Sequence, residues 1–185
     1  IIGIGGAGMS AIATVLLEGG YQISGADKAL TGTMRALRQQ GATVFIGLTI
    51  AAALMGTQVM PGEWYETLVK PSWTPPNWVF GPAWGLLYIL IAAAGFIAWW
   101  RGAGSAAIAT WVLSVVLNGL WSPVFFGAEQ PLAGLVVIGL MWLSIVLFIA
   151  RTWRKARGAA WLFVPYLLWV SYALSLNAGI VVLNG

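Results

Sequence analysis

QPLAGLVVIGLMWLSIVLFIA, residues 130–150, is a run of 21 residues without a formal charge, bounded by Glu129 and Arg151. A helix rises about 1.5 Å per residue, so a run of this length spans the roughly 30 Å hydrocarbon core of a bilayer. Residues 135–140 are continuously apolar, whereas the strands of a membrane β-barrel alternate apolar and polar residues. The run therefore predicts a transmembrane helix.

Four more uncharged runs surround this one, and each is long enough for one crossing of the bilayer and too short for a comfortable second crossing. They lie at residues 39–62, 71–100, 102–128 and 158–185. The sequence thus predicts an all-α membrane protein with a bundle of five transmembrane helices. We place the spans at about Thr43–Met60, Val79–Trp100, Gly104–Phe126, Leu132–Thr152 and Ala160–Leu183.

The composition agrees with a membrane chain. Of 185 residues, 60% are hydrophobic and 8% are charged, against about 25% charged residues in a typical soluble domain. The sequence contains no Cys and no His, which excludes a disulfide scaffold, a thiolate or histidine metal site and a Ser-His-Asp or Cys-His catalytic device. We expect the lipid bilayer as a partner, no metal and no nucleic acid.

The basic residues are divided unevenly between the two sides of the predicted bundle. With five spans, eight of the nine Lys and Arg residues share a side with the N-terminus, and Lys70 is on the opposite side. Short loops rich in Lys and Arg stay in the cytoplasm. The charge pattern therefore predicts a cytoplasmic N-terminus and a C-terminus on the opposite side of the membrane.

Residues 1–47 carry a different pattern, in which strand-like and helix-like stretches alternate. The apolar start runs into glycines, SAIATVLLEGG (10–20) predicts a helix, and YQISGAD (21–27) predicts a strand. TMRALRQQGA (33–42) predicts a second short helix, and TVFIG (43–47) fits either a third strand or the first span. We therefore predict a short, incomplete Rossmann-like βαβ fragment before the bundle.

A glycine-rich turn lies between the first predicted strand and helix of this fragment. Gly3, Gly5 and Gly8 have the spacing G-x-G-x-x-G and precede Ser10. At such a turn the free backbone N–H groups can bind a phosphate. The spacing marks these four residues as a candidate nucleotide site.

The sequence GIGGAGMSAIATVLLEGGYQISGAD (3–27) resembles the N-terminal segment of the UDP-N-acetylmuramate–L-alanine ligase family. The resemblance implies that this loop contacts the UDP part of a substrate through Gly5, Gly6, Gly8, Met9 and Ser10. It extends over about residues 1–47 only, and the chain contains no G-x-x-x-x-G-K-[ST] motif to hold ATP. We expect a vestigial nucleotide site and no ligase activity.

The segment after the first span is rich in tryptophan and proline. Residues 61–88 read PGEWYETLVKPSWTPPNWVFGPAWGLLY. Pro71, Pro75 and Pro76 disfavour a helix and predict a stiff loop. Aromatic residues in such a loop are typical of anchors at the membrane interface, and they also suit the roof of an apolar pocket.

Two predicted helices carry amides among apolar residues. NGLWSPVFF (118–126) holds Asn118 and Trp121, and PYLLWVSYALSLN (165–177) holds Trp169, Ala173 and Asn177 on one face at i, i+4 and i+8. A buried amide needs hydrogen-bond partners. The residues alone fit either hydrogen bonds between helices or a ligand pocket.

These motifs, in this order, resemble the TspO family, the tryptophan-rich sensory proteins related to mitochondrial translocator protein. The resemblance covers about residues 48–184 and implies a five-helix bundle, usually dimeric, with a pocket beneath the first loop that binds porphyrins and other tetrapyrroles. By this resemblance the pocket is lined by Tyr65, Pro75, Trp84, Tyr88, Asn118, Trp121, Trp169 and Ala173. Trp84 and Trp169 match two tryptophans linked in some members to porphyrin breakdown.

We therefore expect two domains, residues 1–47 and 48–185, and a membrane-embedded sensor or regulator that binds a porphyrin or haem, as a homodimer. Indole rings stack on a flat macrocycle, and the lack of His and Cys removes the usual strong axial ligands of haem iron. We thus expect the tetrapyrrole as a ligand and no obligatory cofactor. The alternatives are a photo-oxidative enzyme that degrades porphyrin and a transporter of porphyrin-like molecules.

Overall fold

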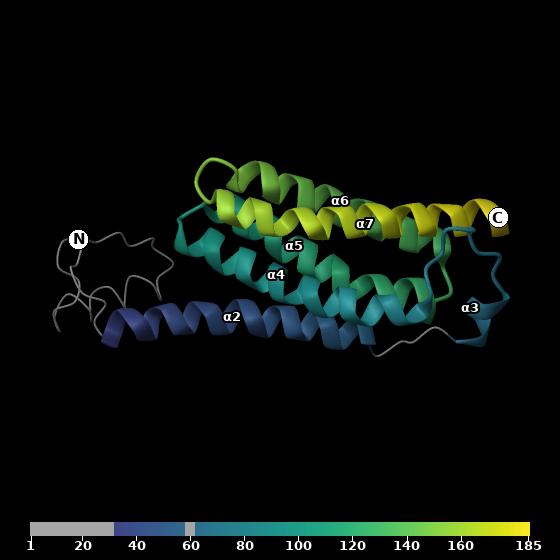
Figure 1. Cartoon of the computed structure of the whole chain (residues 1–185), viewed down its shortest axis with the longest axis horizontal. Helices are drawn as coiled ribbons and strands as arrows, with labels where there is room; N and C mark the ends of the chain where they lie inside the picture. Colours follow the sequence, from purple (N-terminus) through teal and green to yellow (C-terminus); the bar gives the residue numbers. More distant parts are fainter. Residues whose placement is uncertain (1–31, 58–61) are drawn as a thin grey trace. The chain divides into compact units, whose positions relative to one another are not determined.

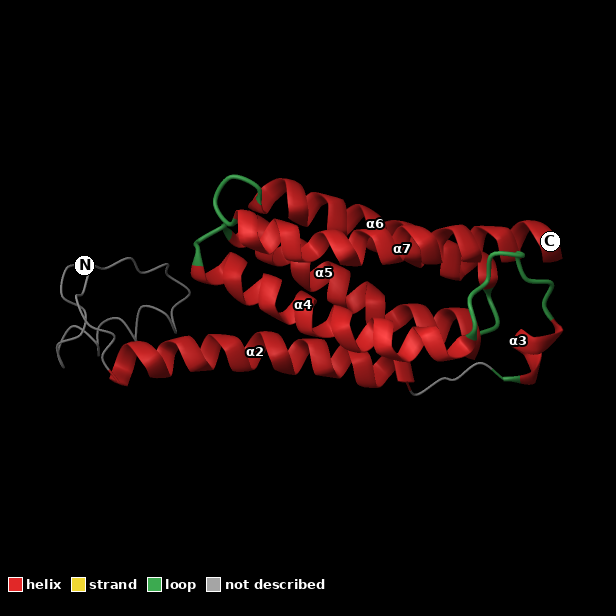
Figure 2. Ribbon diagram, in the orientation of Figure 1, coloured by secondary structure: helices red, strands yellow, loops and turns green. Residues whose placement is uncertain are grey.

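The computed structural model describes residues 32–57 and 62–185, and these residues form helices joined by loops, without a strand among them (Figures 1 and 2). The helical elements are α2 Gly32–Thr57, α3 Glu63–Thr67, η1 Asn77–Val79, α4 Phe80–Trp100, α5 Ser105–Ser122, η2 Pro123–Gly127, α6 Pro131–Thr152 and α7 Arg157–Asn184. Residues up to Val44 and residues from Phe45 onward form two compact units. The bundle described below is the second unit.

Within residues 32–57 and 62–185, five helical segments are long and apolar enough to cross a membrane, which confirms the predicted five-span architecture. They are Gln39–Gly56, Asn77–Trp100, Ser105–Gly127, Pro131–Thr152 and Arg157–Asn184. Each lies close to its predicted counterpart, because formal charges are excluded from the hydrocarbon core and therefore fall near the span ends.

The third strand considered for residues 43–47 is wrong, and so is the end of a short helix at about residue 42. α2 runs through both positions as one helix. The hydroxyls of Thr43 and Thr49 donate to the carbonyls of Gln39 and Phe45, at 2.9 and 2.8 Å, as helical threonines do. A membrane-length apolar helix satisfies every backbone group within itself, whereas a lone strand would leave them unpaired.

The remaining parts of the predicted βαβ fragment cannot be compared in the same way. The earlier strands, the first helix and the candidate nucleotide residues Gly3, Gly5, Gly8 and Ser10 lie outside the described residues. The correction from strand to helix therefore concerns residues 43–47, which α2 joins to the predicted helix at residues 33–42.

The core of the bundle is packed between α4, α5, α6 and α7, which run alongside one another (Figure 2). Trp111 of α5 is fully buried, donates its indole N–H to the carbonyl of Ile91 at 2.8 Å and meets Phe45 of α2 edge-on. A Cβ on Gly95 would lie 2.5 Å from Trp111 Cε2, so this glycine lets the indole approach the α4 backbone. Large aliphatic side chains such as Ile89 and Leu168 are exposed on the outer surface, as the lipid-facing side of a membrane bundle requires.

Candidate ligand site beneath the first loop

The loop at residues 68–76, between α3 and η1, is fastened to α7. Val69 and Asn184 exchange two hydrogen bonds of 2.9 Å, from the Val69 N–H to Asn184 Oδ1 and from Asn184 Nδ2 to the Val69 carbonyl. The hydroxyl of Tyr172 donates to the carbonyl of Trp73 at 2.7 Å. We call residues 68–76 the cover loop; its backbone is held by two side chains of α7.

A close contact adds to these hydrogen bonds. Gly179 of α7 lies against Pro71 so tightly that a Cβ would fall 2.5 Å from the proline Cγ. Pro71 itself is buried. The missing side chain at position 179 therefore lets the cover loop sit directly on the α7 backbone.

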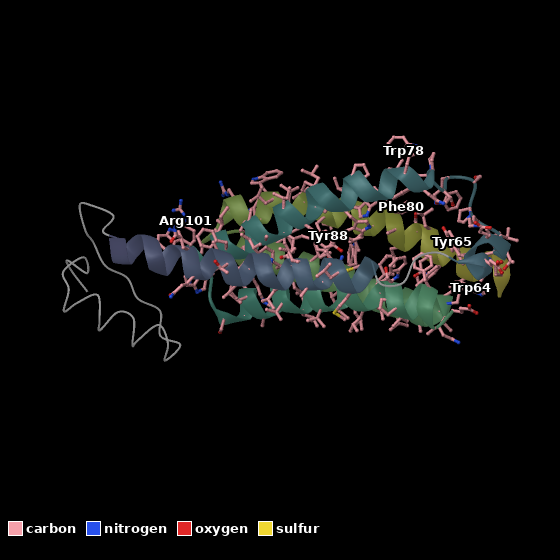
Figure 3. The ribbon with its side chains drawn as sticks, turned by 90° about the horizontal axis from the view of Figure 1, so that it is seen from below. Trp64, Tyr65, Trp78, Phe80, Tyr88 and Arg101 are labelled. Atoms are coloured by element: carbon pink, nitrogen blue, oxygen red, sulfur yellow. The ribbon has the colours of Figure 1, made fainter. Side chains whose placement is uncertain are left out.

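Trp84 of α4 and Trp169 of α7 meet edge to face where the two helices pack together. Their ring centroids are 6.4 Å apart and their planes lie at 83°. Tyr88 stacks on Trp84, at 5.4 Å and 29°, and Phe80 meets Trp169 edge-on at 5.8 Å. Two helices thus contribute perpendicular aromatic faces to one cluster; Figure 3 labels Phe80 and Tyr88 along α4.

The indole N–H of Trp169 is buried and has no hydrogen-bond partner among the described residues. An unpaired buried donor costs about 1–3 kcal/mol. By contrast, the indole N–H groups of Trp121 and Trp142 both have side-chain acceptors. Trp169 therefore has a free donor for which residues 32–57 and 62–185 supply no acceptor.

Asn118 of α5 forms hydrogen bonds with side chains of two other helices, α4 and α7. It accepts from the Tyr88 hydroxyl at 3.0 Å through Oδ1 and donates to the Tyr166 oxygen at 3.2 Å through Nδ2. Tyr166 in turn donates to Met141 Sδ at 3.2 Å. Of the two interpretations open from the sequence, hydrogen bonding between helices describes this amide.

Trp121 belongs to a second aromatic cluster, which contacts α3. Its N–H donates to Asn177 Oδ1 at 3.2 Å, and it stacks on Phe125 at 5.0 Å and 21°. Tyr65 of α3 meets Phe126 edge-on at 5.2 Å. Because Pro123 has no N–H, the α-helical bonding of α5 gives way to the π-helical turn η2, which positions both phenylalanines.

Beside the cover loop lies a hollow of about 430 Å³, lined by Tyr65, Glu66, Lys70, Thr74, Pro75, Pro76 and Asn77. Tyr65 and Pro75 are predicted site residues. Burial raises the pKa of the Tyr65 phenol above its ordinary value of 10.0, so the phenol is neutral and can donate at physiological pH. Ala173, also predicted, is half-buried one turn beyond Trp169.

Lys70 is a residue of this hollow that the sequence reasoning missed. Its ammonium lies 4.6 Å from the centroid of the Tyr65 ring and 3.4 Å from the Glu66 carbonyl. The sequence did contain a signal for Lys70: it is alone on its side of the predicted bundle, because every other Lys and Arg falls on the opposite side. A lone cation at the more acidic end of a membrane protein is a candidate contact for an anion.

The TspO/MBR family model matches residues 42–183, which is most of the chain. The chain belongs to this family. The tryptophan-rich protein TspO of Chlorobaculum tepidum is 41% identical over 146 residues, which are 75% of this chain and 92% of that protein. The translocator protein of Homo sapiens is 34% identical over 143 residues, which are 71% of this chain and 85% of that protein.

A third relative and a second family model also match parts of the chain. The tryptophan-rich protein TspO of Archaeoglobus fulgidus is 45% identical over 123 residues, covering 65% of this chain and 80% of that protein. Residues 1–61 match the model of the Mur ligase family, catalytic domain. This TspO/MBR protein is therefore an integral, multi-pass membrane protein whose first 61 residues are similar to a second, unrelated family.

Proposed function

We propose that this TspO/MBR protein binds a tetrapyrrole, either a porphyrin or haem, against Trp84 and Trp169 beneath the cover loop, and acts as a sensor or regulator. The observation that carries the proposal is the buried, unpartnered N–H of Trp169. A ligand with a carbonyl, carboxylate or ring-nitrogen acceptor would remove the cost of leaving this donor unpaired.

The aromatic cluster supports a planar ligand. Trp84 and Trp169 meet at 83°, so one ring can stack on a macrocycle while the other meets its edge, and each such contact contributes about 0.5–1.5 kcal/mol beyond area burial. Lys70 provides a positive charge at the hollow for a propionate. Asn118 already bonds Tyr88 and Tyr166, so we assign it to holding the site together.

The sequence favours a metal-free porphyrin or loosely held haem over tightly ligated haem. His and Cys, the usual strong axial ligands, do not occur in the chain. The cytoplasmic N-terminus, which the distribution of Lys and Arg supports, and a homodimeric state belong to the same proposal. In this arrangement the cover loop faces away from the cytoplasm.

The test is a titration of the full-length protein in detergent with protoporphyrin, followed by quenching of tryptophan fluorescence. The double variant Trp84→Phe/Trp169→Phe removes the free indole donor and replaces two large indole faces with smaller phenyl rings. We expect the apparent Kd to rise about tenfold or more, from the loss of roughly 1.4 kcal/mol or more.

Trp99→Phe is the matched control, because Trp99 also belongs to α4 but packs near the opposite end against Phe45 and Phe96. This variant should bind with the affinity of the unaltered protein. Equal affinities for the control and the double variant would contradict the proposed site.

A second candidate function is photo-oxidative degradation of bound porphyrin, with dioxygen as the oxidant. It is favoured by the chain of aromatic rings from Trp169 through Trp84 to Tyr166 and Tyr88, with centroid separations between 5.4 and 6.4 Å. Illumination in air would then yield a spectrally distinct product that the double tryptophan variant does not form. Unchanged porphyrin after illumination of the saturated protein would leave binding alone.

A further inference from the structure

The turn between α6 and α7 carries a cluster of cations. Arg151, Arg154, Lys155 and Arg157 lie within seven residues, and all four side chains are exposed. The turn begins directly after Thr152, where α6 ends, and stops at Arg157, where α7 begins. The four charges therefore lie at the junction of two spans, at the depth of the lipid headgroups.

These cations have no carboxylate near them in the described part of the chain. Its acidic residues are Glu63, Glu66 and Glu129. Glu129 precedes α6, whose 22 residues separate it from the turn by about 33 Å at 1.5 Å per residue. The ring contacts of Tyr65 with Phe125 and Phe126 bring α3, with the other two acidic residues, to the same end as Glu129.

Two exposed indoles flank the cluster. Trp153 is 40% exposed and Trp161 is 59% exposed, and their ring centroids are 5.8 Å apart. The Arg157 guanidinium lies 5.7 Å from the centroid of Trp153. Tryptophan favours the zone between headgroups and acyl chains, so the pair lies where a phospholipid changes from polar to apolar.

The backbone beneath these side chains is ordered by burial. Ala156 and Thr152 are buried, and the N–H of Ala156 donates to the Thr152 carbonyl at 2.8 Å. The N–H of Trp153 donates to the Ile149 carbonyl at 3.0 Å, and that of Ala159 to the Ala156 carbonyl at 2.9 Å. The turn is thus fixed from within while its cations and indoles are exposed, so little backbone conformational entropy is lost when they bind a partner.

We propose that the α6–α7 turn is a binding site for an anionic phospholipid. Arg151, Arg154 and Lys155 contact the phosphate and the headgroup, while Trp153 and Trp161 pack against the glycerol and upper acyl region. Juxtamembrane clusters of Lys and Arg attract anionic lipids. The pair of indoles next to the cations distinguishes this turn from a merely solvated charged loop and commits the site to a lipid, which has an apolar part for them.

Brominated lipids test the proposal, because bromine on an acyl chain quenches a tryptophan that touches it. The full-length protein is reconstituted in phosphatidylcholine vesicles with equal mole fractions of either dibromo-phosphatidylglycerol or dibromo-phosphatidylcholine. The signal of Trp153 and Trp161 is the difference between the unaltered protein and the Trp153→Phe/Trp161→Phe variant. We expect the brominated anionic lipid to quench this signal at least about threefold more strongly, and less so in high salt.

The triple variant Arg151→Gln/Arg154→Gln/Lys155→Gln should lose this excess quenching. Arg101→Gln is the matched control: it removes a cation from the α4–α5 turn, at the same end of the bundle (Figures 1 and 3), and should retain the excess. Equal quenching of the unaltered protein by the two brominated lipids would overturn the proposal, whether or not the triple variant folds. An equal loss in Arg101→Gln and in the triple variant would also overturn it, because general surface charge would then explain the effect.

Discussion

The two ends of the helical bundle differ in how their polar and charged groups are partnered. At the end with the cover loop, amides and phenols are hydrogen-bonded to backbone groups of the protein itself, as Asn184 is to Val69 and Tyr172 is to Trp73. At the other end, the α6–α7 turn presents cations that remain exposed. The difference agrees with the two proposals, a ligand site at the first end and a lipid site at the second.

Gly179→Ala should have the largest effect on the difference between the two ends, because it acts on the cover loop. The new Cβ would lie 2.5 Å from Pro71 Cγ and 3.6 Å from Trp73 Cζ2, so the cover loop must move off α7. Overpacking of this kind costs about 1–3 kcal/mol. We expect a lower thermal unfolding midpoint in detergent and weaker quenching by protoporphyrin.

Gly158→Ala provides the control on the same helix at the opposite end. Nothing lies within 4 Å of a Cβ at this position, and alanine favours a helix over glycine by about 0.5–1 kcal/mol. This variant should be as stable as the unaltered protein or slightly more so. If Gly179→Ala matches it in stability and in porphyrin binding, the seating of the cover loop on α7 has no role in the site.

Asn118→Ala should have the next largest effect. It leaves the partly buried hydroxyl of Tyr88 and the buried hydroxyl of Tyr166 without their amide partner, and we expect a loss of about 1–2 kcal/mol in the free energy of unfolding in mixed micelles. Combining it with Tyr166→Phe should cost less than the sum of the two single changes, because the residues share a hydrogen bond.

Ser175→Ala serves as the comparison for this measurement. Ser175 is exposed, and its hydroxyl bonds the Tyr172 carbonyl within its own helix. Its loss should change the free energy of unfolding by less than about 0.5 kcal/mol. Similar losses in the free energy of unfolding for Asn118→Ala and Ser175→Ala would show that Asn118 does not stabilise the contact between helices.

Lys70→Met should have the smallest effect and the most selective one. A partly exposed ion pair contributes up to about 1 kcal/mol, so the Kd for protoporphyrin should rise by roughly threefold to fivefold. The Kd for protoporphyrin dimethyl ester, which has no free propionate, should not change. Arg101→Met, at the opposite end, should alter neither Kd; a parallel weakening of acid and ester in Lys70→Met would assign Lys70 to packing.

The five spans could be predicted from the sequence because the position of the charges and the thickness of a bilayer determine them. The same rule explains the error at residues 43–47. A strand-like pattern and a resemblance to a soluble enzyme suggested a sheet, but the apolar run from residue 39 has the length of a span, and α2 follows that run. In a membrane chain, the length of an apolar segment outweighs its local β propensity.

The partners of individual polar residues in the site could not be predicted. The spacing of Trp169, Ala173 and Asn177 on one helix follows from its periodicity, but Asn118 is 48 residues from Tyr166 in the chain. No local pattern encodes that hydrogen bond. The free N–H of Trp169 and the position of Lys70 beside Tyr65 also depend on tertiary packing, and so they emerge from the structure alone.

Because Asn184 anchors the backbone of Val69, the cover loop can be anchored only after the last helix has been synthesised. The two residues are 115 positions apart, and a ribosome that adds about 5–20 residues per second reaches Asn184 roughly 6–23 s after Val69. During that interval four further membrane helices, α4 to α7, must be synthesised, and the cover loop has no anchor on α7 until the last of them is complete. Under the proposed function, a nascent chain would therefore bind a tetrapyrrole only after the last helix is in place, and a chain released before that point would not bind it.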